Sequence, residues 1–145
     1  MTLRMRSRLP ALGLLGLALL GAGPCGPFPG GRLSGSEVAL PGDWSFVGSG
    51  SACAVEVRPA EPHSVRATCF ANEGTLYVGA LFAPRKRWPT FVAADADVRV
   101  QIGDDVYPLR AVRIEDAAER ARVLGPEPSD SHWLYRLEPR AVAAE

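Results

Sequence analysis

The chain has 145 residues, of which 16 are basic and 16 are acidic, so it is formally neutral. Three of the arginines, Arg4, Arg6 and Arg8, precede any acidic residue, which leaves 13 basic and 16 acidic residues, net −3, for the rest of the chain. A nucleic-acid-binding domain needs a basic face, so this balance argues against nucleic acid as a partner. About 120 residues follow the amino-terminal segment, which suits one domain of common size.

Residues 1–24 predict an export signal or a membrane anchor. The basic start is followed by 15 mostly apolar residues, from Leu9 to Gly23, and then by a stretch rich in Gly and Pro. This order is typical of an export signal, and the apolar run is shorter than the roughly 20 residues of a comfortable transmembrane helix. The arginines favour a cytoplasmic amino terminus. We therefore expect the domain outside the cytoplasmic membrane, on its periplasmic or extracellular face, either tethered or secreted.

Three ways of processing this segment stay open: an uncleaved anchor, a lipoprotein and plain secretion. Cys25 lies where a lipoprotein signal places its lipidated cysteine, but Pro24 directly before it restricts the backbone that a peptidase must bind. Residues 25–42 are rich in Gly and Pro and predict a tether.

Residues 52–71 predict an antiparallel hairpin centred on Glu61. In this register one face is apolar and the other carries an ion pair, Glu56 opposite Arg66. The facing pairs of the apolar side are Cys53 with Cys69, Val55 with Ala67, and Val57 with Val65. An oxidising compartment would let Cys53 and Cys69 form a disulfide, whereas two reduced, buried thiols packed as small apolar groups are the alternative.

The following elements complete a mainly β pattern. Asn72-Glu73-Gly74 predicts a turn, and Gly103-Asp104-Asp105 predicts a second hairpin. A capping box from Asp116 to Glu119 starts a helix that ends near Gly125. The remaining predicted elements are strands at 75–82, 98–102, 106–114 and 133–137 and a helix at 88–94. We therefore predict a six- to seven-stranded antiparallel split β-barrel with two short helices over residues 43–140.

The order of these elements resembles the flavin-type split-barrel superfamily, which includes pyridoxamine-phosphate-oxidase-like proteins and deazaflavin-dependent nitroreductases. The resemblance rests on the hairpin, on the strand that begins at Asn72, on the basic cluster Arg85-Lys86-Arg87, and on the stretch from Asp95 to Ile102. Membrane-tethered members, in which a stretch like Gly42 to Val47 precedes the barrel, are the most similar.

The resemblance implies a homodimer with FMN or a related flavin across its interface. It also implies that Arg85, Lys86 and Arg87 hold the cofactor phosphate, for which Arg offers a planar fork and Lys a point charge. A solvated basic loop is the alternative reading of this cluster. The chain lacks the Gly-rich basic turn of the deazaflavin branch and has Pro59 to His63 there instead, which argues against deazaflavin.

No set of residues in the sequence identifies a catalytic mechanism. His63 and His132 stand apart from any Ser or Cys in a nucleophile signature, and with Cys53 and Cys69 they make a poor zinc set. Catalytic residues therefore stay unassigned, and we expect no metal site. The leading hypothesis is an exported or membrane-tethered barrel that binds a flavin-like cofactor for redox chemistry. The alternative is a non-catalytic barrel that has lost the cofactor and serves binding or envelope structure.

Overall fold

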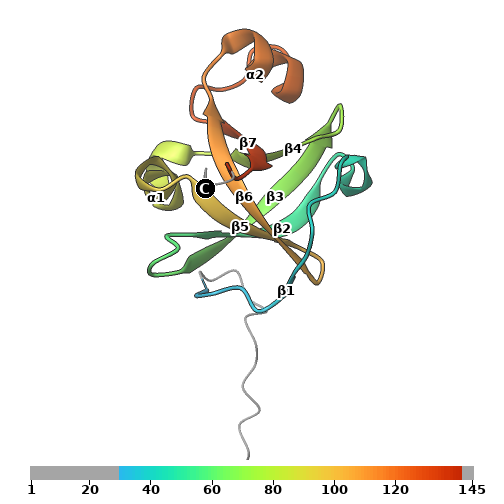
Figure 1. Cartoon of the computed structure of the whole chain (residues 1–145). Helices are drawn as coiled ribbons and strands as arrows, with labels where there is room; N and C mark the ends of the chain where they lie inside the picture. The colour runs from blue at the N-terminus through green and yellow to red at the C-terminus, as the bar shows by residue number, and fades with distance from the viewer. Residues whose placement is uncertain (1–29, 142–145) are drawn as a thin grey trace, which may run out of the picture.

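The computed structural model of the protein describes residues 30–141, and these form a closed antiparallel barrel of six strands with one extra strand (Figure 1). The strands follow one another around the barrel in the order β6-β5-β2-β3-β4-β7, and pairing of β6 with β7 closes it. The short extra strand β1 pairs in parallel with β6. The fold class predicted from the sequence is thus confirmed: mainly β, with two short α-helices in the described part. The expected signal segment 1–24 and Cys25 lie outside the described residues.

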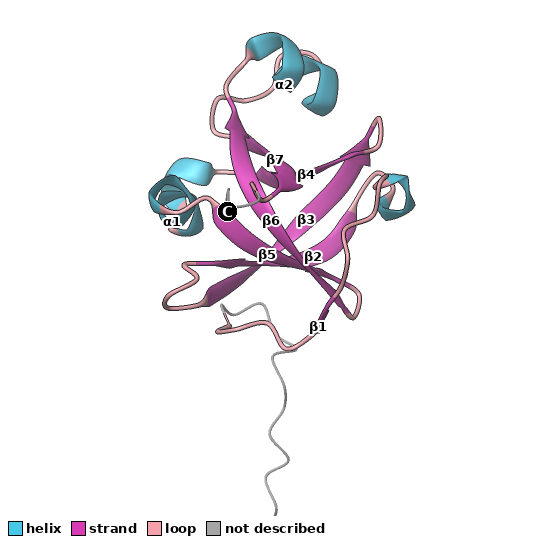
Figure 2. Ribbon diagram, in the orientation of Figure 1, coloured by secondary structure: helices cyan, strands magenta, loops and turns pink. Residues whose placement is uncertain are grey.

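The predicted elements and the observed ones agree closely in position. The strands are β1 Ser36–Glu37, β2 Ser51–Val57, β3 His63–Asn72, β4 Thr75–Ala80, β5 Asp97–Ile102, β6 Asp105–Ile114 and β7 Trp133–Pro139. The helices are α1 Trp88–Ala94 and α2 Ala117–Leu124, with 3₁₀ turns η1 at Ser45–Val47 and η2 at Ala83–Arg85. Both α-helices lie outside the barrel wall, as the ribbon in Figure 2 shows.

Local chemistry explains where the second helix and the sixth strand lie. The Asp116 side chain accepts a hydrogen bond of 2.8 Å from the backbone N–H of Glu119, as an N-cap should. Pro108 lies in β6 between Val106, where pairing with β1 ends, and Leu109, where pairing with β7 begins. Pro108 lies opposite Arg99 of β5, and its missing N–H falls on the other edge of β6, in the gap between the β1 and β7 pairings.

The register predicted for the β2–β3 hairpin is wrong by two residues. Cys53 lies opposite Ala67, and Cys69 lies opposite Ser51. The backbone N–H of Glu61 donates to the carbonyl of Arg58 at 2.9 Å, which makes Pro59 the second residue of a β-turn. This turn centres the hairpin on residue 60 rather than on Glu61. A shift of two residues keeps every side chain on its face, so the predicted apolar face is still the inner one.

The predicted ion pair between Glu56 and Arg66 is also wrong. Glu56 lies opposite Ser64, and it is buried although it points away from the barrel interior. Its carboxylate accepts hydrogen bonds from the Arg99 guanidinium at 3.0 Å and from the backbone N–H of Leu33 at 2.6 Å. Residues of the expected tether, 25–42, therefore cover this part of the wall: Gly30 also pairs with Ser64.

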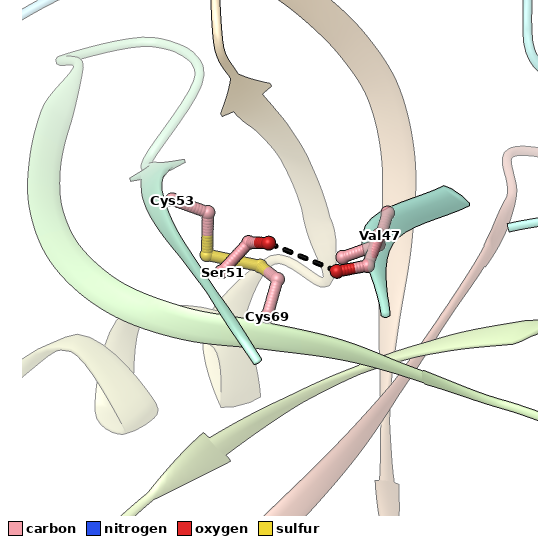
Figure 3. Close-up of a disulfide and its surroundings, with 4 residues drawn as sticks. All are labelled: Val47, Ser51, Cys53 and Cys69. Atoms are coloured by element: carbon pink, nitrogen blue, oxygen red, sulfur yellow. Dashed lines mark hydrogen bonds between the residues drawn. A yellow bond between two sulfur atoms is a disulfide. The ribbon is translucent and has the colours of Figure 1, made fainter. Parts of the chain in front are cut away.

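The barrel interior is filled by aliphatic side chains, and the Cys53–Cys69 disulfide lies among them. The two cysteines are on one face, diagonal to each other, with their Cα atoms 5.8 Å apart. That separation is ordinary for a disulfide. Figure 3 shows the bond beside Ser51, whose hydroxyl donates to the carbonyl of Val47 at 2.9 Å. Core residues from five strands surround it, among them Val55, Val78, Val100, Leu109 and Leu137.

Within residues 30–141, none of the helices has the length and hydrophobicity needed to cross a bilayer.

Candidate functional site

An open cavity of the described surface lies on the outer wall of β3 and β4, next to the basic cluster. It has a volume of about 500 Å³, which is within the range of small-molecule sites. We call it the β3–β4 cleft. Its lining residues come from β3, β4, the 81–88 segment and the loop before β7: Arg66, Ala67, Thr68, Phe70, Gly79, Leu81, Lys86, Trp88 and His132.

Gly79 forms the floor of the cleft, and the imidazole of His132 rests on it. A Cβ atom at Gly79 would lie 2.7 Å from Nε2 of His132, much closer than two such atoms approach. Gly79 is therefore the residue that lets the ring lie against β4. The backbone fixes the other end, because the N–H of His132 donates to the carbonyl of Ser129 at 2.9 Å and its own carbonyl accepts from Arg120 at 3.2 Å.

The charged side chains that line the cleft are all positive. Arg66 and Lys86 are both exposed, and no acidic residue is among the described residues of the lining. Of the eleven other described basic residues, six form a salt bridge: Arg58, Arg99, Arg110, Arg113, Arg122 and Arg136. Arg66 and Lys86 have none within residues 30–141. The cleft thus brings together two positive charges that no acidic side chain of the described residues offsets.

Of the three basic residues predicted as a phosphate site, the structure places one in the lining of this cleft and the other two outside it. Lys86 lines the cleft, whereas Arg85 ends the turn η2 and is not part of the lining. The guanidinium of Arg87 lies 5.7 Å from the ring centre of Phe91 on α1, outside the cleft lining. Of the cluster, Lys86 is the residue with the position to contact a ligand in this cleft.

The surroundings of His132 disfavour its protonated form. Burial lowers the pKa of the imidazole, and the nearby positive charges of Arg120 and Lys86 lower it further. Among the described residues, the hydrogen bonds of His132 are those of its backbone N–H and carbonyl. His132 is therefore a mainly neutral ring near pH 7. Its Nε2 points at Gly79, which leaves Nδ1 as the nitrogen to meet a ligand.

Apolar side chains frame the cleft and its rim. Phe70 stacks on Tyr77 with ring centres 5.8 Å apart, and Trp88 is buried beneath the basic segment. Leu81 and its neighbour Phe82 are 54% and 62% exposed, and Phe46 in the turn η1 is also 62% exposed. Phe82 also has a positive φ of 55°, a conformation that a bulky residue seldom adopts. Flat apolar surfaces therefore lie beside uncompensated positive charge.

Two smaller cavities, on the walls of β6 and β7, share Arg113 and Trp133. The guanidinium of Arg113 lies 3.5 Å from the Trp133 ring centre, so the two side chains form a cation–π contact with each other. The acidic residues Glu115 and Asp130 line the cavity of about 240 Å³ there. The described residues contain no group of three His, Cys, Asp or Glu side chains placed to hold a metal ion.

Sequence reasoning missed most of this cleft for identifiable reasons. Arg66 had been placed in an ion pair by the wrong register, and His132 had no recognisable partner in the sequence. Gly79 reads as an ordinary strand glycine unless its contact with His132 is known, and that contact spans 53 positions. The arrangement can bind an anion next to a flat apolar group, and it contains no nucleophile with a positioned base. No model of a known protein family and no curated protein matches the chain.

Proposed function

We propose that this protein is an exported or membrane-tethered split-barrel domain that binds a flavin-type cofactor, FMN or a related flavin, in the β3–β4 cleft. The observation that carries the proposal is the pair Arg66 and Lys86, two cations without acidic partners among the described residues, in one cleft with Phe70 and Leu81. A phosphate-bearing aromatic molecule combines the same two features, an anion and a flat apolar ring.

The fold is compatible with this proposal. A closed six-stranded antiparallel barrel with a helix between β4 and β5 has the element order that led to the split-barrel resemblance. In the proposal a second copy of the chain covers Leu81 and Phe82 at the cleft rim, so that the cofactor lies across a dimer interface. Bound flavin would supply hydride and single-electron transfer, and this chain's residues would hold its phosphate and exclude water from its ring.

Binding of FMN compared with riboflavin tests the proposal, because the two differ by the phosphate. We expect the purified full chain in detergent to bind FMN, and to bind riboflavin at least about tenfold more weakly, the ratio that corresponds to 1.4 kcal/mol. Lys86→Gln and Arg66→Gln should each reduce FMN affinity. Arg85→Gln is the matched control, since Arg85 is a neighbouring cation that does not line the cleft.

The second candidate, a non-catalytic barrel for binding or envelope structure, is favoured by the exposed Leu81 and Phe82, which suit a protein contact as well as a cofactor rim. It predicts that the chain takes up neither FMN nor riboflavin, and that neither cleft variant changes this. Equal FMN affinity in the wild type and both cleft variants would also remove the cleft from the proposal.

A further inference from the structure

We propose that the β3–β4 cleft is a proton-linked anion site: an anionic group binds against Arg66, Lys86 and His132, and one proton is taken up with it on the imidazole. The inference deepens the proposed function, because it rests on the cleft being a ligand site. It does not require the ligand to be a flavin, so the two can fail separately.

The first step is that the His132 side chain packs against the cleft wall and its backbone is held by hydrogen bonds. Its ring lies on the backbone of Gly79, at a distance that leaves no room for a side chain there. Its backbone is held by Ser129 and by the guanidinium of Arg120. Because Nε2 points at Gly79, Nδ1 is the ring nitrogen for which a ligand in the cleft would be the hydrogen-bond partner.

The second step is the balance of charge around the ring. Lys86 faces it from the segment before α1, Arg120 from α2, and Arg66 lines the same cleft from β3. From β4 the neighbour is the uncharged Gly79. Asp130 is on the same loop as His132, but it lines a different cavity, with Arg113 and Arg120. Without a ligand, the described surroundings thus oppose a further positive charge on the imidazole.

The third step is the effect of a bound anion on the protonation of His132. A negative group between these cations offsets their repulsion and accepts a hydrogen bond from a ring N–H, so it favours the protonated imidazole. The pKa of His132 must then be higher in the complex than in the free protein. Between these two pKa values, binding takes up a proton, and affinity rises by up to about tenfold for each pH unit of acidification. Outside that window the affinity is independent of pH.

The probe should carry a charge that does not titrate. Phenyl sulfate serves, because a phosphate monoester changes its own charge near pH 6. We expect the full chain to bind phenyl sulfate more tightly as the pH falls from about 8 to 5. Calorimetry in two buffers of different ionisation enthalpy should show proton uptake within the window. His132→Gln should remove the pH dependence and the uptake, and His63→Gln should keep both, since His63 packs on Phe91 away from the cleft lining.

Gly79→Ala tests the geometry without removing the imidazole. The added methyl group would lie 2.7 Å from Nε2, and the ring can swing outward because it is the far end of a side chain. We expect this variant to fold, with an unchanged circular dichroism spectrum, and to lose most of the pH dependence of phenyl sulfate binding. Full pH dependence in folded Gly79→Ala or in His132→Gln would overturn the inference.

The outcomes also separate this inference from the proposed function. FMN binding with pH-independent phenyl sulfate affinity would refute the proton linkage and leave the flavin proposal standing. Proton-linked phenyl sulfate binding without FMN binding would refute the flavin proposal and leave the proton linkage standing. Failure of the chain to bind either probe at any pH from 5 to 8 would overturn both.

Discussion

Two polar regions on the outer wall of the same barrel differ in how their charged side chains are paired and buried. On the β2–β5 side, Glu56 is buried and is bonded to Arg99, which also contacts Glu37 at 3.2 Å. The chain segment around Leu33 covers this region. On the β3–β4 side, Arg66 and Lys86 are exposed in an open cleft without an acidic partner in the described chain. We call the first region the closed side.

The difference separates structural charge from charge that is available for binding. Burying a carboxylate is tolerated only when hydrogen bonds and an opposite charge replace its water, and Glu56 has both. An exposed arginine or lysine loses little by lacking a partner, so folding alone does not require Arg66 or Lys86 to be in the cleft. The closed side should therefore respond to mutation in stability, and the cleft should respond in ligand affinity.

The largest expected effect is on the closed side. Glu56→Ala removes the partner of Arg99 and the acceptor of the Leu33 N–H, and we expect it to lower the free energy of unfolding by about 3 kcal/mol, the lower end for a broken buried pair. Arg99 keeps Glu37, which is why the lower end applies. Urea denaturation measures the change.

Glu37→Gln is the matched control, because Glu37 contacts the same arginine from an exposed position. Its cost should stay below about 1 kcal/mol. Equal costs for the two variants would show that burial of Glu56 does not distinguish the closed side.

The next effect concerns the disulfide, which joins β2 of the closed side to β3 of the cleft. Its cysteines are 16 positions apart, and a loop of this length corresponds to about 3 kcal/mol in the chain-entropy account. We expect the double variant Cys53→Ala, Cys69→Ala to lose roughly 2–3 kcal/mol of stability. Reduced wild-type protein, measured in the same denaturant series, controls for the lost side chains, and it should lose a similar amount.

Much of this fold was predictable, because its local signals agree with one another. Alternation located β2 and β3, the glycine turns located the β3–β4 and β5–β6 connections, and the Asp116 cap located the start of α2. The register of β2 and β3 was not predictable from alternation, since two registers that differ by two residues present the same faces. The position of Pro59 in the turn decides between them.

The site was harder to predict because its parts are far apart in the sequence. Arg66, Gly79, Lys86 and His132 come from different segments, and pairing of β4 with β3 on one side and with β7 on the other brings them together. β1 was missed because two residues paired to a strand edge leave no periodic signal. The burial of Glu56 was missed because the segment that covers it had been assigned to a tether.

A smaller effect on stability should accompany changes in the cleft. Arg66→Gln should alter the free energy of unfolding by no more than about 0.5 kcal/mol, since the side chain is exposed and has no salt bridge in the described chain. The same variant should weaken anion binding about tenfold, by loss of a charge-assisted hydrogen bond. Arg110→Gln, on β6 outside the cleft, should leave anion binding unchanged. A stability loss at Arg66 comparable with that at Glu56 would contradict the contrast between the two regions.

The smallest expected effect is the pH dependence that His132 gives to folding. Burial and the charges of Arg120 and Lys86 hold its folded-state pKa below the ordinary value of 6.5. Between the folded and the unfolded pKa, the unfolded chain binds more protons, so stability falls as the pH is lowered through 6.5 towards the folded pKa. His132→Gln should remove this component, so the free-protein difference between wild type and variant should widen on acidification, whereas His63→Gln should follow the wild type. With saturating phenyl sulfate this acid loss should become smaller, because the anion raises the folded-state pKa: the ligand's stabilisation of the wild type should be greatest in acid and decline as the pH rises through the pKa of the complex. Denaturation series from pH 5 to 8, with and without the ligand, measure both effects, and a ligand stabilisation that does not change with pH would mean that the proton on His132 does not belong to anion binding.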